Sequence, residues 1–108
     1  MSAKDAAVCT GTLEAATPAD VDFDVSNSRS VCLIIENTGV SNALGTTVVK
    51  KSADGTNFGT DSALGTAIGS IAASGIVLVE LTDVAFKTLR LKLTSTNGTT
   101  YRITMRGT

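Results

Sequence analysis

Hydrophobic and polar residues alternate in short runs along most of this chain. The clearest run spans residues 20–25. Val21, Phe23 and Val25 fall on one side of an extended backbone, and three aspartates fall on the other. A period of two is the pattern of a β-strand with one buried face, and helical periodicity is almost absent. The pattern therefore predicts an all-β protein.

Clusters of Gly, Asn, Asp and Ser separate the runs, as turn residues separate strands. Their spacing indicates about seven to eight antiparallel strands, which is typical of a β-sandwich or jelly roll. The length of 108 residues suits one domain, so we expect a single domain at residues 1–108 with a flexible N-terminal segment at about residues 1–7. The predicted strands are residues 6–14, 20–25, 31–35, 46–51, 76–81, 86–94 and 100–106.

Three of these strands carry more specific expectations. Asn97 and Gly98 form a pair that is typical of tight hairpin turns. We therefore expect strands 86–94 and 100–106 to pair with each other. Strand 31–35 is apolar on both faces, which predicts a central strand covered at least in part on both sides.

Residues 59–75 are rich in Gly, Ala, Ser and Thr. Leu64, Ile68 and Ile71 fall at helical spacing, but glycines lie among them, and each glycine costs about 1 kcal/mol in a helix. We therefore predict an extended loop with at most a short strand. Long loops in compact domains are often functional, so these three residues are candidate contacts with a partner.

The composition argues against catalysis and against several kinds of partner. The chain has no His, so no imidazole can activate a Ser or Cys nucleophile, and we expect no enzyme. A net charge of −1 gives no attraction to nucleic acid or membrane, and only 4% of the residues are aromatic, too few for a base-stacking or sugar-stacking platform. No apolar run suffices to span a bilayer, and the polar start predicts no signal peptide.

Metal and disulfide sites were each weighed against simpler roles. Asp54, Asn57 and Asp61 offer oxygen ligands near one turn, but their spacing is not that of an EF-hand, and turn chemistry explains them without calcium. We expect no cofactor. Cys9 and Cys32 could form one disulfide between strands or remain two buried thiols, and the lack of a secretion signal favours the thiols.

Charged residues form an acidic stripe on strand 20–25 and a basic face on the last two predicted strands. One alternative is that the two stripes neutralise each other as cross-strand pairs within one sheet. A second is that one copy's acidic strand meets a neighbour's basic hairpin, a head-to-tail contact that closes into a ring such as a trimer. A third is a basic patch for an acidic partner. The interface candidates in the stripes are Asp20, Asp22, Asp24, Arg90, Lys92, Arg102 and Arg106.

Two segments resemble a known group of proteins. They are KSADGTNF at residues 51–58 and FKTLRLKL at residues 86–93. Together they resemble small β-sandwich modules in the virion proteins of tailed bacteriophages, including head decoration or cement proteins. The resemblance implies a structural protein made in the host cytoplasm that binds the major capsid protein on the outer surface of the shell as a trimer. Residues 2–7, residues 59–75 and the charged stripes would then carry the contacts.

The same two segments also resemble discoidin-like carbohydrate-binding β-sandwiches. In this chain Phe58 stands where those domains usually have Trp, and no Tyr lies beside Arg90. This second resemblance implies a glycan-binding module in a tail or baseplate, with Phe58 and Arg90 at the sugar. A glycan-binding module is thus the alternative to a capsid decoration protein.

Overall fold

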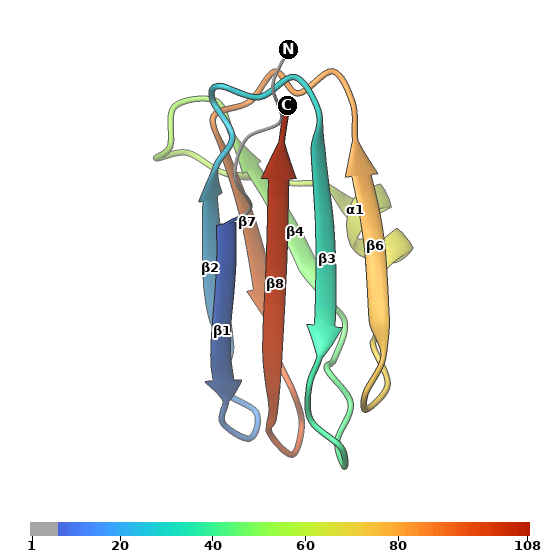
Figure 1. The fold of residues 1–108 in the computed structure, drawn as a ribbon. Helices are drawn as coiled ribbons and strands as arrows, with labels where there is room; N and C mark the ends of the chain where they lie inside the picture. Colours follow the sequence, from blue (N-terminus) through green and yellow to red (C-terminus); the bar gives the residue numbers. More distant parts are fainter. Residues whose placement is uncertain (1–6) are drawn as a thin grey trace.

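The chain forms a β-sandwich of two antiparallel four-stranded sheets in a computed structural model that describes residues 7–108 (Figure 1). Most of the predicted N-terminal segment 1–7 therefore lies outside the described residues. The predicted all-β fold is confirmed. Among residues 7–108, no helix is long and apolar enough to cross a membrane.

We call the two layers sheet A and sheet B. Sheet A has the order β1-β8-β3-β6, and sheet B has the order β2-β7-β4-β5. The strands of sheet A are β1 (Ala7–Leu13), β8 (Thr99–Gly107), β3 (Val31–Asn37) and β6 (Ile76–Leu81). The strands of sheet B are β2 (Ala19–Asp24), β7 (Thr88–Leu93), β4 (Val48–Ser52) and β5 (Gly59–Thr60). A short helix, α1 (Ser62–Ile68), follows β5.

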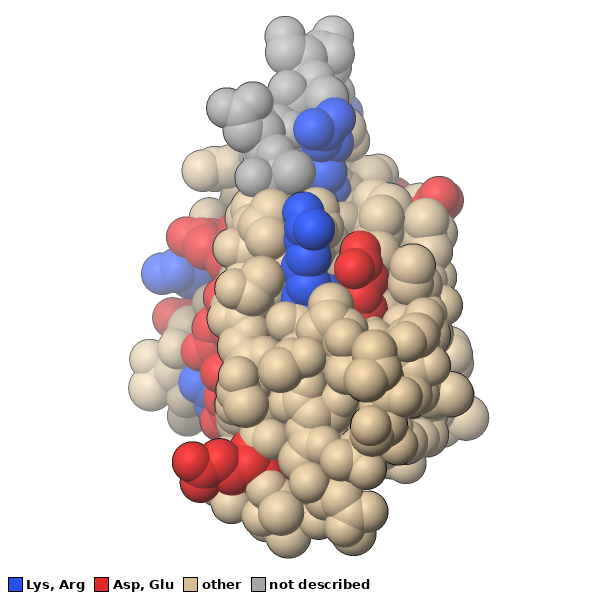
Figure 2. All heavy atoms as spheres, turned by 60° about the horizontal axis from the view of Figure 1, so that its bottom comes forward, with Lys and Arg blue, Asp and Glu red and all other residues tan. Residues whose placement is uncertain are grey.

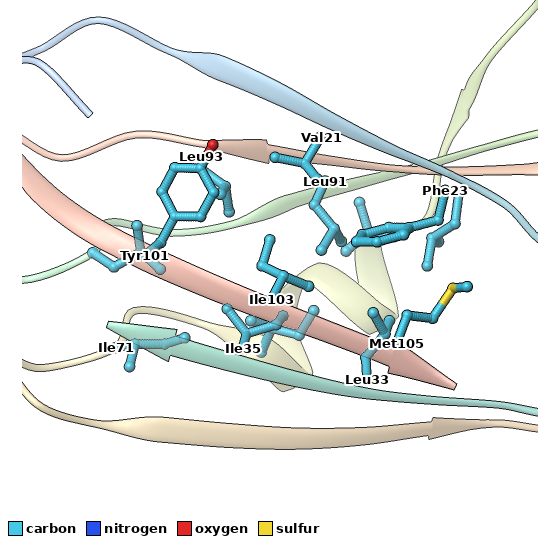
Figure 3. Close-up of a cluster of buried hydrophobic side chains, with 14 of the residues drawn as sticks. Val21, Phe23, Leu33, Ile35, Ile71, Leu91, Leu93, Tyr101, Ile103 and Met105 are labelled. Carbon is cyan, nitrogen blue, oxygen red and sulfur yellow. The ribbon is translucent and has the colours of Figure 1, made fainter. Parts of the chain in front are cut away.

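Consecutive strands alternate between the two sheets, except for β4 and β5, which pair with each other. This connectivity is that of an eight-stranded jelly roll. The core lies between the layers and is filled by alternate residues of every strand except β5, as the alternation predicts (Figure 3). Its fully buried members include Leu33, Ile35, Leu89, Leu91, Leu93 and Ile103.

The predicted hairpin between the last two strands is wrong. β7 lies in sheet B and β8 lies in sheet A, between β1 and β3. The connection is tied to other loops, because Gly45 donates its N–H to the Thr94 carbonyl and Ala16 donates its N–H to the Ser95 carbonyl. The inward side chains of the two strands therefore face each other across the core. The basic face is divided between the two sheets as a result.

The segment 59–75 contains a short strand, β5, which the prediction allowed, but also α1, so the prediction of a loop without a helix is wrong. Asp61 caps the helix by accepting the N–H of Leu64 at 3.0 Å. Gly65, counted against a helix, allows this one to pack on β4. A Cβ there would lie 3.1 Å from the carbonyl oxygen of Thr47, so glycine gives the helix its close approach. Gly69, with φ of 62°, ends the helix in a conformation that favours glycine.

The three apolar residues of this segment belong to the core. Ile68 and Ile71 are each 3% exposed, and Leu64 packs against the core from the helix. They fall at helical spacing because they form the buried side of α1 and of the bridge that follows it, where Ile71 pairs with Leu44. The prediction that Ile68 and Ile71 contact a partner is therefore wrong, whereas for the half-buried Leu64 it stays a prediction.

Candidate functional site

The outer face of sheet B carries a ladder of opposite charges. In the strand register, Asp20 lies opposite Lys92 and Asp22 lies opposite Arg90. The Arg90 guanidinium donates two hydrogen bonds to the Asp22 carboxylate, at 2.8 and 2.9 Å. It also lies 4.0 Å from Asp20. Cross-strand pairing within one sheet, one of the alternatives for the stripes, is confirmed for this pair.

The ion pair changes the pKa of both of its partners. The hydrogen bonds from Arg90 hold the pKa of Asp22 below its usual value, and the same bonds raise the pKa of Arg90. Both groups therefore stay charged across the physiological range. Asp24, the last residue of the acidic stripe, turns its carboxylate to the backbone N–H and hydroxyl of Ser26, at 3.0 and 2.6 Å. The acidic stripe is thus largely occupied by contacts within its own chain.

Phe58 completes this arrangement on sheet B. The turn before it is organised by Asp54, which accepts the backbone N–H groups of Thr56 and Asn57, each at 2.8 Å. Those bonds hold the pKa of Asp54 well below its usual value. The turn brings the Phe58 ring to 3.9 Å from the Arg90 guanidinium, a cation–π contact. Because that face of the ring is taken, the geometry does not favour sugar stacking on Phe58.

Two of the three candidate calcium ligands, Asp54 and Asp61, use their carboxylates in other contacts. Asp54 accepts a backbone N–H of its own turn. Asp61 caps α1 and also forms an ion pair with Lys51, in which the carboxylate oxygen lies 2.7 Å from the ammonium nitrogen. The bond from Lys51 is the main cause of the lowered pKa of Asp61. Lys51 also lies 4.8 Å from the centre of the Phe86 ring. Among residues 7–108, no group of three His, Cys, Asp or Glu side chains is placed to hold a metal ion.

The two cysteines lie on opposite faces of sheet A. Cys9 is opposite Ile103 in the register and packs against the core. Cys32 is opposite Arg106 and faces outward. Both thiols are free, so the disulfide alternative is wrong. Both cysteines are half-buried, Cys9 on the side that packs against the core and Cys32 on the outer surface, so neither is the fully buried thiol of the second alternative.

The outer face of sheet A is different in character, because an apolar row crosses it. The register aligns Val8 of β1 with Thr104 of β8, then with Ile34 of β3, then with Leu78 of β6. Val8 is 53% exposed and Leu78 is 57% exposed. Ile76, on the same face, is 64% exposed. Figure 2 shows this side of the molecule as a broad surface with few charged side chains.

The few charges on this face include the two remaining interface candidates. Arg102 lies opposite Glu36 in the register, and Arg106 lies opposite Cys32, whose other neighbour is Glu80. Both arginines are exposed, and among residues 7–108 neither makes an ion pair of the kind that holds Arg90. Their guanidinium groups are therefore available to a partner.

Sequence reasoning missed the apolar row. Strand 31–35 was expected to be central and covered at least in part on both sides, and it is, with Val31, Leu33 and Ile35 buried and Cys32 and Ile34 half-buried. The openness of its outward face was not predicted. The length of the chain held the missing signal. A domain of 108 residues forms two layers, so no third layer covers the outer face of a sheet. A strand that is apolar on both faces therefore has one apolar face at the surface.

No family model and no curated protein matches this chain. Solved structures do share its fold. The Yersinia pseudotuberculosis-derived mitogen is 14% identical, with 96% of this chain and 86% of that chain covered and a TM-score of 0.60. The Aeromonas hydrophila periplasmic inhibitor of g-type lysozyme is 14% identical, with 93% and 83% covered and a TM-score of 0.54. The Bacillus licheniformis lipase BlEst2 is 8% identical, with 94% and 21% covered and a TM-score of 0.58. At these identities the similarity shows the sandwich fold alone.

Proposed function

We propose that this protein is a structural binding module that attaches to a larger protein assembly through the outer face of sheet A. The observation that carries the proposal is the apolar row of Val8, Thr104, Ile34 and Leu78 on an open, sparsely charged sheet face. Contiguous exposed apolar surface rimmed by polar groups is typical of protein interaction sites. A flat sheet face suits a flat protein surface better than it suits a small molecule, which needs a concave site.

The assembly we propose is the capsid of a tailed bacteriophage, with the major capsid protein as the partner and this chain as a head decoration protein. The support is the resemblance of residues 51–58 and 86–93 to such modules. In the fold these two segments lie together on sheet B, where Phe58 contacts Arg90. They would therefore form the solvent side of the bound module, and sheet A would face the shell. Jelly rolls build viral capsid domains and lectin domains alike, so the fold by itself does not choose between them.

The charged groups of sheet B support binding over catalysis. Carboxylates that could act as acid or base are engaged by cations of the same chain, Asp22 by Arg90 and Asp61 by Lys51. Groups so paired have lowered pKa values, whereas a general base that works near neutral pH needs a pKa close to that pH. We therefore assign the paired charges to holding the outer surface of sheet B in order.

Co-sedimentation with capsids that lack the protein tests this proposal. We expect the wild-type protein to pellet with the shells at micromolar concentration. Ile34→Glu should weaken binding by at least about tenfold, because an unpaired carboxylate would be buried in the contact. Val48→Glu is the matched control, since Val48 is also a half-buried residue, but on the outer face of sheet B.

Two outcomes would contradict the proposal. A folded wild-type protein that stays in the supernatant would remove the capsid as the partner. Equal binding by the wild type and Ile34→Glu would show that the outer face of sheet A is not the contact. Circular dichroism of both variants confirms that the fold is intact before the comparison is made.

A further inference from the structure

β6 is an edge strand with an unusual composition for an exposed edge. In the part of the chain that the structure describes it pairs only with β3, and five of its six residues are apolar, Glu80 being the exception. Its outward residues Ile76 and Leu78 are among the most exposed large apolar side chains of the molecule. Its inward residues are also only partly buried. A long apolar edge of this kind is a template for pairing with another strand.

The hydrogen-bond phase of β6 determines which backbone groups reach the free edge. The N–H of Asn37 donates to the carbonyl of Gly75 at 3.0 Å, so these opposite residues form a hydrogen-bonded pair. In an antiparallel ladder such pairs recur at every second residue. The N–H and C=O groups of Ile76, Leu78 and Glu80 therefore point away from β3. Among residues 7–108, no backbone hydrogen bond outside the β3 ladder uses these groups.

The edges of sheet B are protected in ways that β6 is not. Pro18 lies directly before β2, whose outer face carries aspartates at every second residue. β5 has only two residues and leads directly into α1. Charges, proline, short strands and covering helices are the devices by which proteins block edge pairing. β6 has no proline and no lysine, and its single charge lies near its end.

We propose that β6 pairs antiparallel with β6 of a second copy of this chain across a two-fold axis, joining two A sheets into one eight-stranded sheet. Directly opposite residues share a face of a sheet, so outward residues have to oppose outward residues. Two registers meet this condition over five residues of β6, one centred on Leu78 and one centred on Val79, and we propose the one centred on Leu78 because it joins the apolar rows of the two copies. It places Leu78 opposite Leu78, and Ile76 opposite Glu80 of the second copy. No two glutamates are opposed.

This register also makes the apolar row continuous. The row from Val8 through Thr104 and Ile34 ends at Leu78, at the edge of sheet A. With the two-fold axis at Leu78, the row meets the identical row of the second copy end to end. The hydrogen-bond pattern is also compatible with this register. The free backbone groups of one copy, on Ile76, Leu78 and Glu80, face those of the same three residues in the second copy. Pairing thus satisfies the free edge and doubles the open face.

Solution mass tests the pairing without any capsid, so its result is independent of the proposed function. Sedimentation equilibrium at tens of micromolar should give a mass twice that of the 11.0 kDa chain. Leu78→Lys would place two ammonium groups opposite each other and should weaken association by at least about tenfold. Val8→Lys is the matched control. It lies on the same face, at 53% exposure against 57%, but at the opposite edge of the sheet, and it should leave the dimer intact.

A second pair of variants tests the register. Ile76→Glu would oppose the Glu80 carboxylate of the second copy and should weaken the dimer, whereas Ile76→Lys would pair with that carboxylate and should preserve it. Circular dichroism confirms that each exposed-site variant is folded. A monomer throughout, or the trimer that the head-to-tail stripes would form, overturns the proposal. Equal effects of Leu78→Lys and Val8→Lys do the same, and equal effects of the two Ile76 variants overturn the register.

Discussion

The two sheets share one core but differ in the side chains on their outer faces. Sheet B neutralises its charges within the chain, through Arg90 and Asp22, and the Phe58 ring lies against the same guanidinium. Its last strand is short and is followed by a helix. Within the described part of the chain, sheet A leaves an apolar row, two arginines without an ion pair and a free edge at β6. The difference teaches that the chain pairs the charges of one outer surface within itself and leaves apolar side chains exposed on the other.

The contrast follows from which residues alternate with the buried ones. On β2 and β7 the outward positions are mostly charged, and the two strands are neighbours, so opposite charges meet. On β3 and β6 the outward positions include Ile34, Ile76 and Leu78, and these strands are also neighbours. The same strand-pairing rule therefore produces a self-satisfied surface in one sheet and a contiguous apolar one in the other.

The largest expected effect is a difference in unfolding free energy between substitutions on the buried face and on the open face of β3. Leu33 is fully buried, and Leu33→Ala should lower the free energy of unfolding by about 2–5 kcal/mol. Its neighbour Ile34 faces outward, and Ile34→Ala should cost less than about 1 kcal/mol. Urea unfolding of the two variants measures the difference. Equal losses would show that Ile34 is covered in the free protein, contrary to the open face described above.

A smaller effect tests how the protected edge of sheet B is held. Asp61→Ala removes the N-cap of α1 and should cost about 1 kcal/mol of stability. Asp61→Asn keeps a capping oxygen and loses only the ion pair with Lys51, so most of the stability should remain. Thermal unfolding distinguishes the two. If both variants lose the same stability, the ion pair rather than the cap holds the helix.

Arginines on the two outer faces should respond differently to truncation. Arg90→Ala removes the partner of Asp22 and uncovers the Phe58 ring, so the melting temperature should fall by a few degrees. Arg102→Ala breaks no such contact and should leave the melting temperature within the error of the measurement. A scanning fluorimetry comparison at low and high salt checks this. An Arg102→Ala variant that melts as early as Arg90→Ala would remove the distinction between the faces.

The smallest effect concerns acid. The pKa values of Asp22, Asp54 and Asp61 are lowered from 3.8 by hydrogen bonds from Arg90, from the N–H groups of Asn57 and Thr56, and from Lys51. Each carboxyl thus binds a proton less readily folded than unfolded, so its contribution is complete above the unfolded pKa and is lost as pH falls through the folded one. Urea midpoints should decline below about pH 4. Asp54→Asn should decline less steeply; an unchanged decline would contradict this assignment.

Part of the candidate surface could be read from the chain. The charged positions Asp22 and Arg90 were identified correctly as outward, because alternation alone sets the face of a residue within its strand. Their pairing was one of several alternatives until the register placed them opposite each other. Leu64, Ile68 and Ile71 were assigned to a surface loop because the cost of glycine in a helix is local, whereas the close packing that requires Gly65 is a tertiary contact.

The sequence by itself determined seven of the eight strands and the inward side of those that alternate clearly, such as β2 and β8, since both follow from residues two positions apart. The tertiary structure decided which strands are neighbours, because that choice depends on how distant segments fit across one core. Asn97 and Gly98 suit a hairpin, yet β8 lies between β1 and β3 and β7 lies in the other sheet. The same choice put Ile34 beside Leu78 and Asp22 beside Arg90. Opposite charges therefore meet on the outer face of sheet B, whereas apolar side chains meet on the outer face of sheet A.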